Sequence, residues 1–447
     1  MPKFRFLYST KQTMSKDLYE EAHSKNLKYG GVFVSTQPGI FLADPAMVKA
    51  MGITYFDYFT DRRPLMDKGV DELLSRSLLS LRGDEWRDMR HSLTPAFTGA
   101  KLRSMVPLMS AACRNLVTVL CSQQSEVQDM RDIYRRLAAD IIATTAFGAP
   151  SDALLDPESK FYAYGRSLMD FKGSRKLVLA GYLISPRLMN FLRVPFLPKQ
   201  LSAFFDSIIR GNISVREEGN LSRPDMIQLL IEQRRKGATI SDADIASQAF
   251  TFFLGGFETV ATAMSFAAFE LAVNPEIQQR LRAEVDAAFE RGGGKLDYDA
   301  ILRLHPVLPI TDRACTSPLN LPEFNLNLKV DDRVLFPFYA FHHDPRYFPH
   351  PDRFDPERFS EANWHDIQPF TFLPFGIGPR NCIGQRFALL EVKLALAYTL
   401  AAVELRTGPD TQVPLKLDPT KIDNSPIGGF MLRTIARPES DTNYKIT

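Results

Sequence analysis

The sequence predicts a mainly helical protein with small β elements, and three observations carry this prediction. An apolar run over 241–273 begins at Ser241 and has Asp244 three residues later, which is the pattern of a capping box. Asn274-Pro275 then provides a cap and a first-turn proline for a second helix, which Gly292-Gly293-Gly294 ends. Over 315–372, prolines punctuate short Leu, Val and Phe runs, as expected of strands and turns.

The remaining segments fit the same fold class. The stretch 84–98 is predicted to be a helix that ends near Pro95, and 131–237 to be helices separated by glycine and proline breaks. From 383 to about 405 the chain is again predicted to be helical. We expect β-rich parts near 30–60, 315–345 and 405–436, one domain over 1–437, and a disordered tail over 438–447.

Composition excludes several classes of protein. The 447 residues contain 54 Lys and Arg against 52 Asp and Glu, so the net charge of +2 offers nothing to attract nucleic acid. Hydrophobic residues at 45% allow a large core, which excludes a disordered chain. Four scattered cysteines lack the dense pairing of a secreted disulfide scaffold, so we expect free thiols in a reducing compartment.

Cys382 lies in a glycine-rich segment directly before a predicted helix, Pro374-Phe375-Gly376-Ile377-Gly378-Pro379-Arg380-Asn381-Cys382-Ile383-Gly384. The amide groups and the positive dipole of a helix N-terminus stabilise a thiolate, and Arg380 adds a cation two residues away. The sulfur is therefore a candidate metal ligand. The glycines allow tight turns and the close approach of a flat macrocycle. A buried structural cysteine in a glycine-rich turn is the alternative.

Five residues of this segment match Phe-x-x-Gly-x-Arg-x-Cys-x-Gly, the haem-thiolate signature of the cytochrome P450 superfamily: Phe375, Gly378, Arg380, Cys382 and Gly384. With this motif and others over 84–430, the chain resembles the animal microsomal branch, which includes insect detoxifying members. The resemblance implies the cytochrome P450 fold, with haem b (iron protoporphyrin IX) between the long helix and the cysteine loop. It also implies Cys382 as the iron ligand, with Phe375, Gly378, Arg380 and Gly384 at the haem.

The resemblance assigns haem roles to further positions. Trp86 and Arg90 are at i and i+4 of a predicted helix and are similar to the family's Trp-x-x-x-Arg, whose side chains bind haem propionates. Arg313 and Arg380 resemble other propionate-binding positions. An exposed cation–π pair of Trp86 with Arg90, and structural salt bridges for Arg313 and Arg380, are the alternatives.

Gly255-Gly256-Phe257-Glu258-Thr259 lies in the middle of the long helix, where a glycine costs up to about 1 kcal/mol relative to alanine. Close approach of a ligand is one reason for such a pair. The resemblance implies that the two glycines open a groove over the haem, with Gly255 among the haem-binding residues, that Thr259 hydrogen-bonds to bound dioxygen, and that Glu258 helps to relay protons. A buried kinked helix or a membrane span over 249–273 is the alternative, and the acidic residues in this run argue against lipid.

By resemblance, the activity is the insertion of one oxygen atom of O2 into a small lipophilic substrate, as in xenobiotic metabolism, with electrons from NADPH through NADPH-cytochrome P450 reductase. Substrate contacts are expected from 65–80, 160–185, the helix before Gly255, 307–310 and 426–430. Members of this branch lie at the cytoplasmic face of the endoplasmic reticulum membrane. Because no spanning anchor is recognisable near the first residue, we expect peripheral membrane contact through 176–184 and 191–201, with an ordinary packed helix pair as the alternative.

One departure from the family concerns the helix that should contain Glu-x-x-Arg. Arg303 aligns with the arginine of that motif, but Ala300 stands where the glutamate belongs. The stretch 295–302 is also too short for the elements expected there, which suggests a deletion. Without the carboxylate, we expect Arg303 and Arg358 of the family's Pro-Glu-Arg-Phe segment to repel each other or to be expelled to water. The competing hypothesis is therefore a truncated, non-catalytic family member that binds haem poorly or not at all.

Overall fold

The computed structural model describes residues 11–34, 37–63, 66–122, 126–149, 151–169, 171, 173–219, 223, 225–291, 299–419, 421 and 424–438. Its contacts divide the chain into two compact units. Unit 1 comprises Met1–Ser92, Phe171–Ala203 and Leu302–Ile383, and unit 2 comprises Leu93–Asp170, Phe204–Ile301 and Gly384–Thr447. Of the tail expected over 438–447, all but Pro438 lies outside the described residues.

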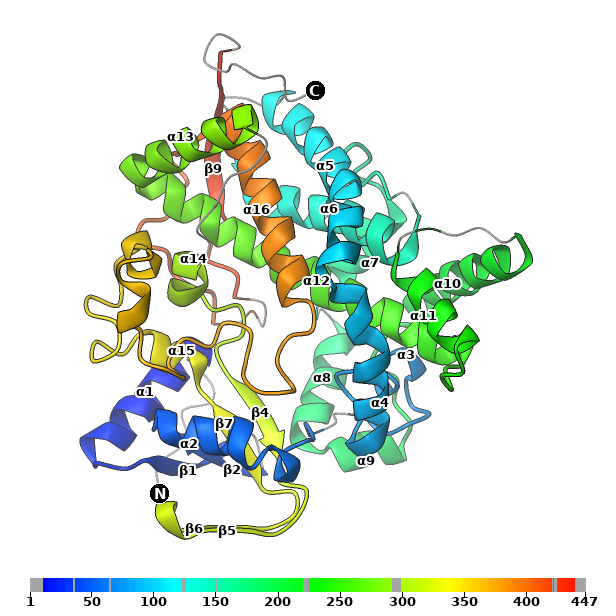
Figure 1. The fold of residues 1–447 in the computed structure, drawn as a ribbon, viewed down its shortest axis with the longest axis vertical. Helices are drawn as coiled ribbons and strands as arrows, with labels where there is room; N and C mark the ends of the chain where they lie inside the picture. Colours follow the sequence, from blue (N-terminus) through cyan, green and yellow to red (C-terminus); the bar gives the residue numbers. More distant parts are fainter. Residues whose placement is uncertain are drawn as a thin grey trace. The chain divides into compact units, whose positions relative to one another are not determined.

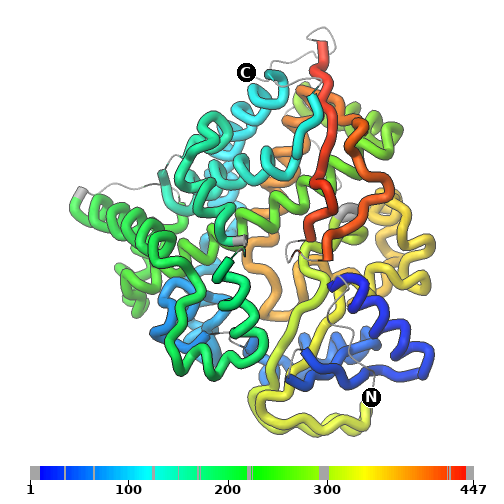
Figure 2. The backbone as a smooth tube through the Cα atoms, turned by 180° about the vertical axis from the view of Figure 1, so that it is seen from behind, coloured from blue at the N-terminus to red at the C-terminus, as the bar shows by residue number. Residues whose placement is uncertain are grey.

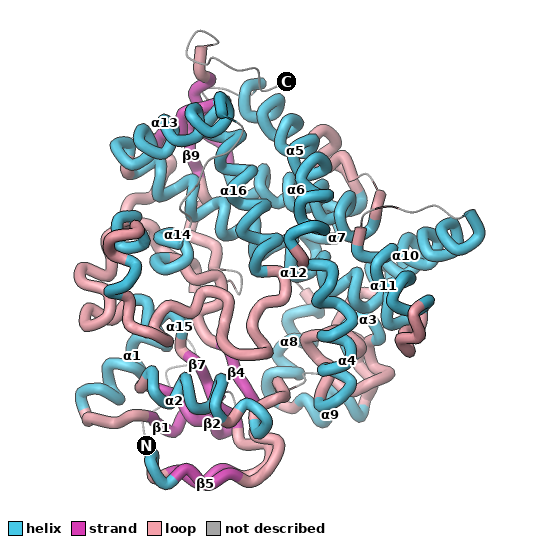
Figure 3. The backbone as a smooth tube through the Cα atoms, in the orientation of Figure 1, coloured by secondary structure: helices cyan, strands magenta, loops and turns pink. Residues whose placement is uncertain are grey.

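Unit 1 contains a four-stranded sheet of order β1-β2-β7-β4, which Figure 3 shows in magenta. β1 and β2 are antiparallel, β2 and β7 are parallel, and β7 and β4 are antiparallel. A separate antiparallel pair joins β5 to β6. The bounds of these strands are β1 Tyr29–Val34, β2 Gln37–Leu42, β4 Thr311–Ala314, β5 Leu319–Leu321, β6 Leu326–Leu328 and β7 Arg333–Phe336.

The sheet of unit 1 shares a hydrophobic core with three helices, α1 (Lys11–Ser24), α2 (Pro45–Lys49) and α15 (Phe338–His342). The β-rich part expected near 30–60 is only partly confirmed, because the strands end at Leu42. The Asp44 carboxylate accepts a hydrogen bond from the amide of Ala46 and caps α2, whose first residue is a proline. The chain then continues as η1, a π-helical turn (Ala50–Thr54), and η2, a 3-10 turn (Phe56–Tyr58).

The predicted helix over 84–98 is confirmed as α4 (Gly83–Leu93), followed by the 3-10 turn η3 (Thr94–Phe97) that contains Pro95. The other short helical elements of unit 1 are α3 (Glu72–Ser75), α8 (Ser174–Ile184), α9 (Pro186–Phe191), η5 (Pro322–Phe324), η6 (Pro356–Phe359) and η7 (Trp364–Asp366), and α14 (Asp299–Leu304) has its last three residues in this unit.

Unit 2 is organised around α12 (Asp242–Val273), which confirms the predicted long helix. Ser241 is its N-cap, and the hydroxyl of Ser241 and the carboxylate of Asp244 bond to each other's backbone amides as a capping box requires. α12 packs on α6 (Met130–Ile142) and α16 (Gln385–Ala402), and α16 packs on α5 (Gly99–Ser122), as Figure 1 shows. Nearly all of the second half of α12 is buried, so this apolar run is the core of unit 2.

The remaining elements of unit 2 surround this core. An antiparallel sheet of order β3-β9-β8 lies beside α12 and is seen from behind in Figure 2. The second predicted helix is confirmed as α13, which begins at Pro275. The bounds are β3 Val127–Asp129, η4 Ala143–Phe147 (a π-helical turn), α7 Lys160–Met169, α10 Lys199–Gly219, α11 Met226–Arg235, α13 Pro275–Arg291, β8 Val403–Thr407 and β9 Met431–Ala436.

Two of the described helices, α5 and α12, are long and apolar enough to cross a membrane by length and composition. In the most apolar part of α12, 72% of the residues are buried inside the protein. Burial of this kind is typical of the central helix of a globular core, and it favours that interpretation of 249–273 over a membrane span.

Candidate functional site

The Cys382 loop closes on itself through three backbone hydrogen bonds in unit 1. The amide of Cys382 donates to the carbonyl of Phe375 at 2.9 Å, and the amide of Asn381 donates to the carbonyl of Gly378 at 2.9 Å. At the start of the loop, the amide of Gly376 donates to the carbonyl of Leu373 at 3.1 Å. Cys382 itself is exposed, so the loop presents a thiol on a fixed backbone.

Two glycines of the loop are required by the backbone, and a third is not. Gly376 and Gly378 have φ of 81° and 68°, a region that favours glycine. A Cβ atom on Gly378 would lie 1.9 Å from the carbonyl oxygen of Gly52 in η1, so this position also needs the missing side chain. Gly384 has a φ of −87°, and a Cβ atom there would make an ordinary contact of 3.7 Å with Phe97. The expectation that Gly384 serves a tight turn is therefore not confirmed.

Arg380 is buried and bonds to backbone carbonyls in unit 1. Its guanidinium donates to the carbonyls of Thr60, Leu78 and Leu81 at 2.6, 3.1 and 2.7 Å, and lies 4.0 Å from the centre of the Trp86 ring. Burial and the charges of neighbouring arginines lower the pKa of Arg380 to about 8. The cation that lies over the Trp86 ring is therefore Arg380. In the alternative drawn from the sequence, the cation of this cation–π pair was Arg90.

Arg90 fixes the residue before the cysteine. Its guanidinium donates to the backbone carbonyl and to the side-chain oxygen of Asn381, both at 2.9 Å. Burial lowers the pKa of Arg90, while negative charge on Cys382 raises it in part. The same opposing effect of Cys382 acts on the pKa of Arg62. Arg62 and Arg90 are therefore two cations whose charge interacts with that of the Cys382 sulfur.

Sequence reasoning missed Arg62, which belongs to a group of four arginines in unit 1. Burial, followed by the charge of Arg62, lowers the pKa of Arg313 to about 9. Arg62 likewise lowers the pKa values of Arg90 and Arg380. We call Arg62, Arg90, Arg313 and Arg380 the arginine cluster. No sequence motif points to Arg62, because its neighbours come from segments about 28, 250 and 320 residues away.

The arginine cluster fits a ligand that carries negative charge. Asp61 and Asp312 are the nearby carboxylates that act on it. The two negative charges of these carboxylates do not balance the four positive charges of the cluster, so its guanidinium groups repel one another. A flat macrocycle with two carboxylates would neutralise this charge, and the exposed thiol beside it is a suitable ligand for iron. The residues present therefore fit haem.

In unit 2, the two glycines of the oxygen-activation segment have different surroundings. A Cβ atom on Gly255 would meet nothing within 4 Å, so this residue faces open space. A Cβ atom on Gly256 would lie 2.5 Å from a methyl carbon of Ile142 on α6, so Gly256 permits helix packing. The Thr259 hydroxyl donates to the carbonyl of Gly255 within the helix. Only Gly255 therefore matches the expected groove.

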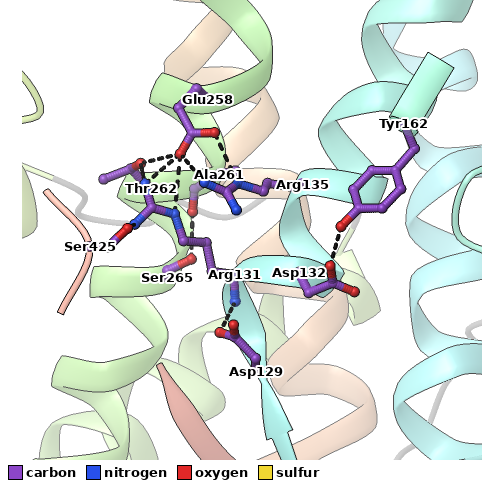
Figure 4. Close-up of polar contacts among 10 residues, drawn as sticks. All are labelled: Asp129, Arg131, Asp132, Arg135, Tyr162, Glu258, Ala261, Thr262, Ser265 and Ser425. Atoms are coloured by element: carbon purple, nitrogen blue, oxygen red, sulfur yellow. Dashed lines mark hydrogen bonds and ion pairs between the residues drawn. The ribbon is translucent and has the colours of Figure 1, made fainter. Parts of the chain in front are cut away.

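Glu258 is buried and is held by two arginines of α6, as Figure 4 shows. Arg135 donates to both carboxylate oxygens at 2.9 Å, and Arg131 donates through Nε at 3.1 Å and also through Nη2. The hydroxyl of Thr262 lies 3.4 Å from Oε1 of Glu258. The Glu258 carboxylate is thus the centre of a charged network between α12 and α6, which sequence reasoning did not foresee.

Arg303 is not expelled to water, so that part of the expectation is wrong. Only 1% of Arg303 is exposed, and its guanidinium donates to the carbonyls of His342, Pro351 and Arg353 at 3.1, 2.7 and 3.0 Å. Carbonyl oxygens therefore accept the hydrogen bonds that a carboxylate would accept in Glu-x-x-Arg. Arg358 donates to the carbonyl of His350 at 3.0 Å and lies 3.8 Å from a carboxylate oxygen of Asp355.

The helices α8 and α9 of unit 1 expose large apolar side chains. Phe191 is 83% exposed and Leu177 is 75% exposed, and the other members of this group are Leu183, Ile184, Leu188 and Leu192. Lys176, Arg187 and Arg193 belong to the same segment. An exposed apolar group of this size with cations beside it is typical of a surface that contacts lipid or a partner.

Comparison with known proteins gives one consistent result. A family model described as Cytochrome P450 matches residues 4–432. The chain is 37% identical to Cytochrome P450 9e2 of Blattella germanica, over 94% of this chain and 87% of that protein. It is 36% identical to Probable cytochrome P450 9f2 of Drosophila melanogaster, over 94% and 88% of the two chains. It is also 37% identical to Probable cytochrome P450 6a13 of the same species, over 87% and 82%.

The length of the first alignment bears on the suggested deletion. It extends over 466 positions, which is more than the 447 residues of this chain. The cockroach protein therefore has residues within the aligned region that have no counterpart here. Within the stretch 295–302, where the deletion was inferred, residues 295–298 lie outside the described residues.

Proposed function

The chain belongs to the cytochrome P450 family, and from this premise we propose that it is a haem-thiolate monooxygenase acting on a small lipophilic substrate. The observation that carries the proposal is the exposed Cys382 thiol, fixed by its loop and accompanied by the arginine cluster. Electrons would come from NADPH through a reductase. Because the family model extends over both units, we also propose that they act as one domain over 1–437.

The residues of unit 1 would hold the haem. Cys382 would be the iron ligand, and the arginine cluster with Trp86 would bind the two propionates. When bound, haem supplies the oxygen-activating redox chemistry, which a thiolate ligand promotes. Arg90 holds the cysteine in place through Asn381. Phe375 accepts the Cys382 amide hydrogen bond, so its backbone fixes the direction of the thiol.

Glu258 and Thr259 would handle protons. A carboxylate followed by a hydroxyl residue on one helix can pass a proton through an ordered water molecule. Gly255 leaves open space one turn before Thr259, which is where such water could lie. The hydroxyl of Thr259 donates to the Gly255 carbonyl and must rotate away from it to serve any other acceptor.

We propose that the substrate is apolar. Phe161 on α7 and Phe253 on α12 belong to two of the stretches that the family resemblance assigns to substrate contact, and their rings lie 6.2 Å apart. Phe205 lies 4.7 Å from the ring of Phe253 and extends the aromatic group. Apolar and aromatic side chains in these stretches would bind a lipophilic molecule through burial and ring contacts, with few polar anchors.

We also propose that the exposed apolar side chains of α8 and α9 lie on the endoplasmic reticulum membrane. The test is flotation of the chain with vesicles of neutral and anionic phospholipid. Replacement of Leu177 and Phe191 by serine should abolish flotation, because these side chains contribute the most exposed apolar surface. A variant that floats as the original chain does would contradict this contact.

The proposed function is tested by the difference spectrum of the dithionite-reduced protein with and without carbon monoxide. A red-shifted Soret band shows thiolate ligation. We expect this band in the original chain and in Cys113→Ser, Cys121→Ser and Cys315→Ser, and its absence in Cys382→Ser. Retention in Cys382→Ser, with loss in one of the other three, would overturn the assignment. Formation of an oxygenated product with NADPH and a reductase then tests turnover.

A second candidate function is a family member without catalysis. Ala300 in place of the motif glutamate and the residues that this chain lacks relative to the cockroach protein favour it. Its signature in the same measurement is a blue-shifted band or no haem absorbance.

A further inference from the structure

The start of α6 connects two segments of unit 2 that are about 170 residues apart in sequence. One is the turn over 424–430, which precedes β9, and the other is the stretch of α12 that contains Glu258 and Thr262. Figure 4 shows Arg131 between Ser425 and Glu258. A single buried side chain therefore contacts both segments.

The guanidinium of Arg131 divides its donors between these segments. Nη1 donates to the hydroxyl of Ser425 at 2.5 Å. Nε donates to Glu258 at 3.1 Å, and Nη2 donates to Glu258 and, at 3.1 Å, to the hydroxyl of Thr262. A guanidinium is planar and rigid, so a change of its orientation at one end changes the geometry at the other.

The backbone beside Arg131 holds the same turn. The amide of Met130 donates to the carbonyl of Phe430 at 3.1 Å, and the amide of Phe430 donates to the Asp129 carboxylate at 3.3 Å. That carboxylate oxygen also accepts the amide of Arg131 at 3.1 Å and caps α6. The ring of Phe430 contacts Phe266 of α12 edge-on, with ring centres 5.0 Å apart. The turn is thus bound to α6 at several points.

We propose that Arg131 is a positioning residue that couples the 424–430 turn to the Glu258 carboxylate. The inference rests on the proposed function, in which Glu258 handles protons, and on the family resemblance, which assigns 426–430 to substrate contact. A substrate that displaces the turn would move Ser425, rotate the Arg131 guanidinium and alter the hydrogen bonds that hold Glu258. Arg135 also binds Glu258, through Nε and Nη2, and adds a second guanidinium to the carboxylate.

Such coupling is reciprocal, which gives a test that needs no turnover. The measurement is amide hydrogen exchange of the peptide over 424–430, followed by mass spectrometry on the full-length protein. In Glu258→Gln, the charge that holds Arg131 is removed from a different helix, and we expect exchange in this peptide to become about tenfold faster. In Arg131→Met exchange should also be faster, and Glu258→Gln should add nothing further in that background.

Arg136→Met is the matched control, because Arg136 lies on the same helix but pairs with Asp132 and lies over the Tyr162 ring. It should leave exchange in the 424–430 peptide unchanged. Arg131→Lys keeps the charge and serves if Arg131→Met does not fold. Arg131→Lys should still couple the turn to Glu258 less strongly than arginine does, because a single ammonium group cannot reproduce the planar set of donors of a guanidinium.

Two results would overturn the inference. One is unchanged exchange of the 424–430 peptide in Glu258→Gln. It would mean that Arg131 holds the turn but does not couple it to Glu258. The other is equal acceleration in Arg136→Met. Neither result depends on the carbon monoxide spectrum, so failure of the inference is distinguishable from failure of the proposed function. In a haem-loaded, active protein, Ser425→Ala should lower the product formed per NADPH consumed about twofold or more.

Discussion

The backbone amide of Leu373 donates a hydrogen bond to Nε2 of His342 at 2.8 Å. His342 is fully buried at the end of α15, and its own carbonyl accepts from Arg303. Leu373 in turn accepts from Gly376 at the start of the Cys382 loop. A continuous set of hydrogen bonds therefore runs from Arg303 through His342 to the loop, and it requires that Nε2 of His342 carries no proton.

This requirement predicts that acid destabilises unit 1. Burial, together with the charges of His343 and Arg303, holds the pKa of His342 well below its usual value, and burial lowers the pKa of His343 to about 3. Between about pH 6.5 and the lowered pKa values, the unfolded chain binds protons at these residues and the folded chain does not. The free energy of unfolding should therefore fall as the pH decreases below about 6.5, by up to about 1.4 kcal/mol per pH unit for each histidine.

The measurement is urea unfolding at pH 7 and pH 5. A double variant, His342→Gln with His343→Gln, removes both titrating groups, and the glutamine oxygen at 342 can still accept from Leu373. Its loss of stability between the two pH values should be smaller than that of the original chain. An equal loss would mean that other groups cause the acid effect.

The path of the main helices could be predicted because their signals are local. The capping box at Ser241 and Asp244, the proline at 275 and the break at Pro95 each act within one helical turn, and each is found in the structure. The helical turns after Asp44 were missed, although Asp44-Pro45 is also a local capping signal, because the apolar run on either side resembles a strand.

The site residues with a family motif could be placed, and those without one could not. Cys382 and Arg90 follow from short patterns. Arg62 and Arg131 have no pattern of their own, because their partners come from distant segments and only the folded chain brings them together. Arg303 shows the opposite case, in which a motif locates the residue but does not predict its partners. The sequence lacks a glutamate three residues before Arg303, but the carbonyls that accept from Arg303 belong to loops whose course no motif predicts.

Removal of the Arg303 side chain should be costly. Arg303→Met leaves the carbonyls of His342, Pro351 and Arg353 without this donor, and each hydrogen bond from a charged donor contributes about 1.5–3 kcal/mol. We expect the free energy of unfolding in urea to fall by about 3 kcal/mol or more. Arg358→Met is the control, with a loss of about 1 kcal/mol, because Arg358 donates to a single carbonyl, that of His350, among the described residues. Similar small losses in both variants would contradict the role of Arg303.

Ala300→Glu alone should not increase the amount of haem that the chain retains. The guanidinium of Arg303 already donates to three carbonyls, and a new carboxylate would have to displace them. The residues missing relative to the cockroach protein would still be missing. Haem per chain, measured as the pyridine haemochrome after gel filtration, should be the same in both proteins. A clear gain in Ala300→Glu would show that one carboxylate was all that the chain lacked.

Gly378 and Gly384, which both belong to the haem-thiolate signature, should respond differently to alanine. Gly378→Ala places a side chain in the left-handed region, which costs about 1–2 kcal/mol, and drives Cβ into the Gly52 carbonyl. We expect a total loss of more than about 2 kcal/mol in the haem-free chain. Gly384→Ala has an ordinary φ and an ordinary contact, so its loss should stay within about 1 kcal/mol. Urea unfolding of both variants decides the matter, and equal losses would contradict this account of the loop.

Arg62→Gln should have opposite effects on the haem-free and haem-bound chain. Without an anionic ligand, Arg62 repels the other three members of the arginine cluster, as their lowered pKa values indicate. Its removal should leave the free energy of unfolding of the haem-free chain unchanged or raise it. With haem bound, the same change removes a partner of the propionates, so haem should transfer to excess apomyoglobin several times faster. Arg63→Gln is the matched control, because the largest charge effect on the pKa of Arg63 comes from Arg333, which is not a member of the cluster. It should alter neither quantity. A haem-free chain that loses as much stability in Arg62→Gln as in Arg303→Met would show that Arg62 is a structural side chain and that the cluster has no need of an anion.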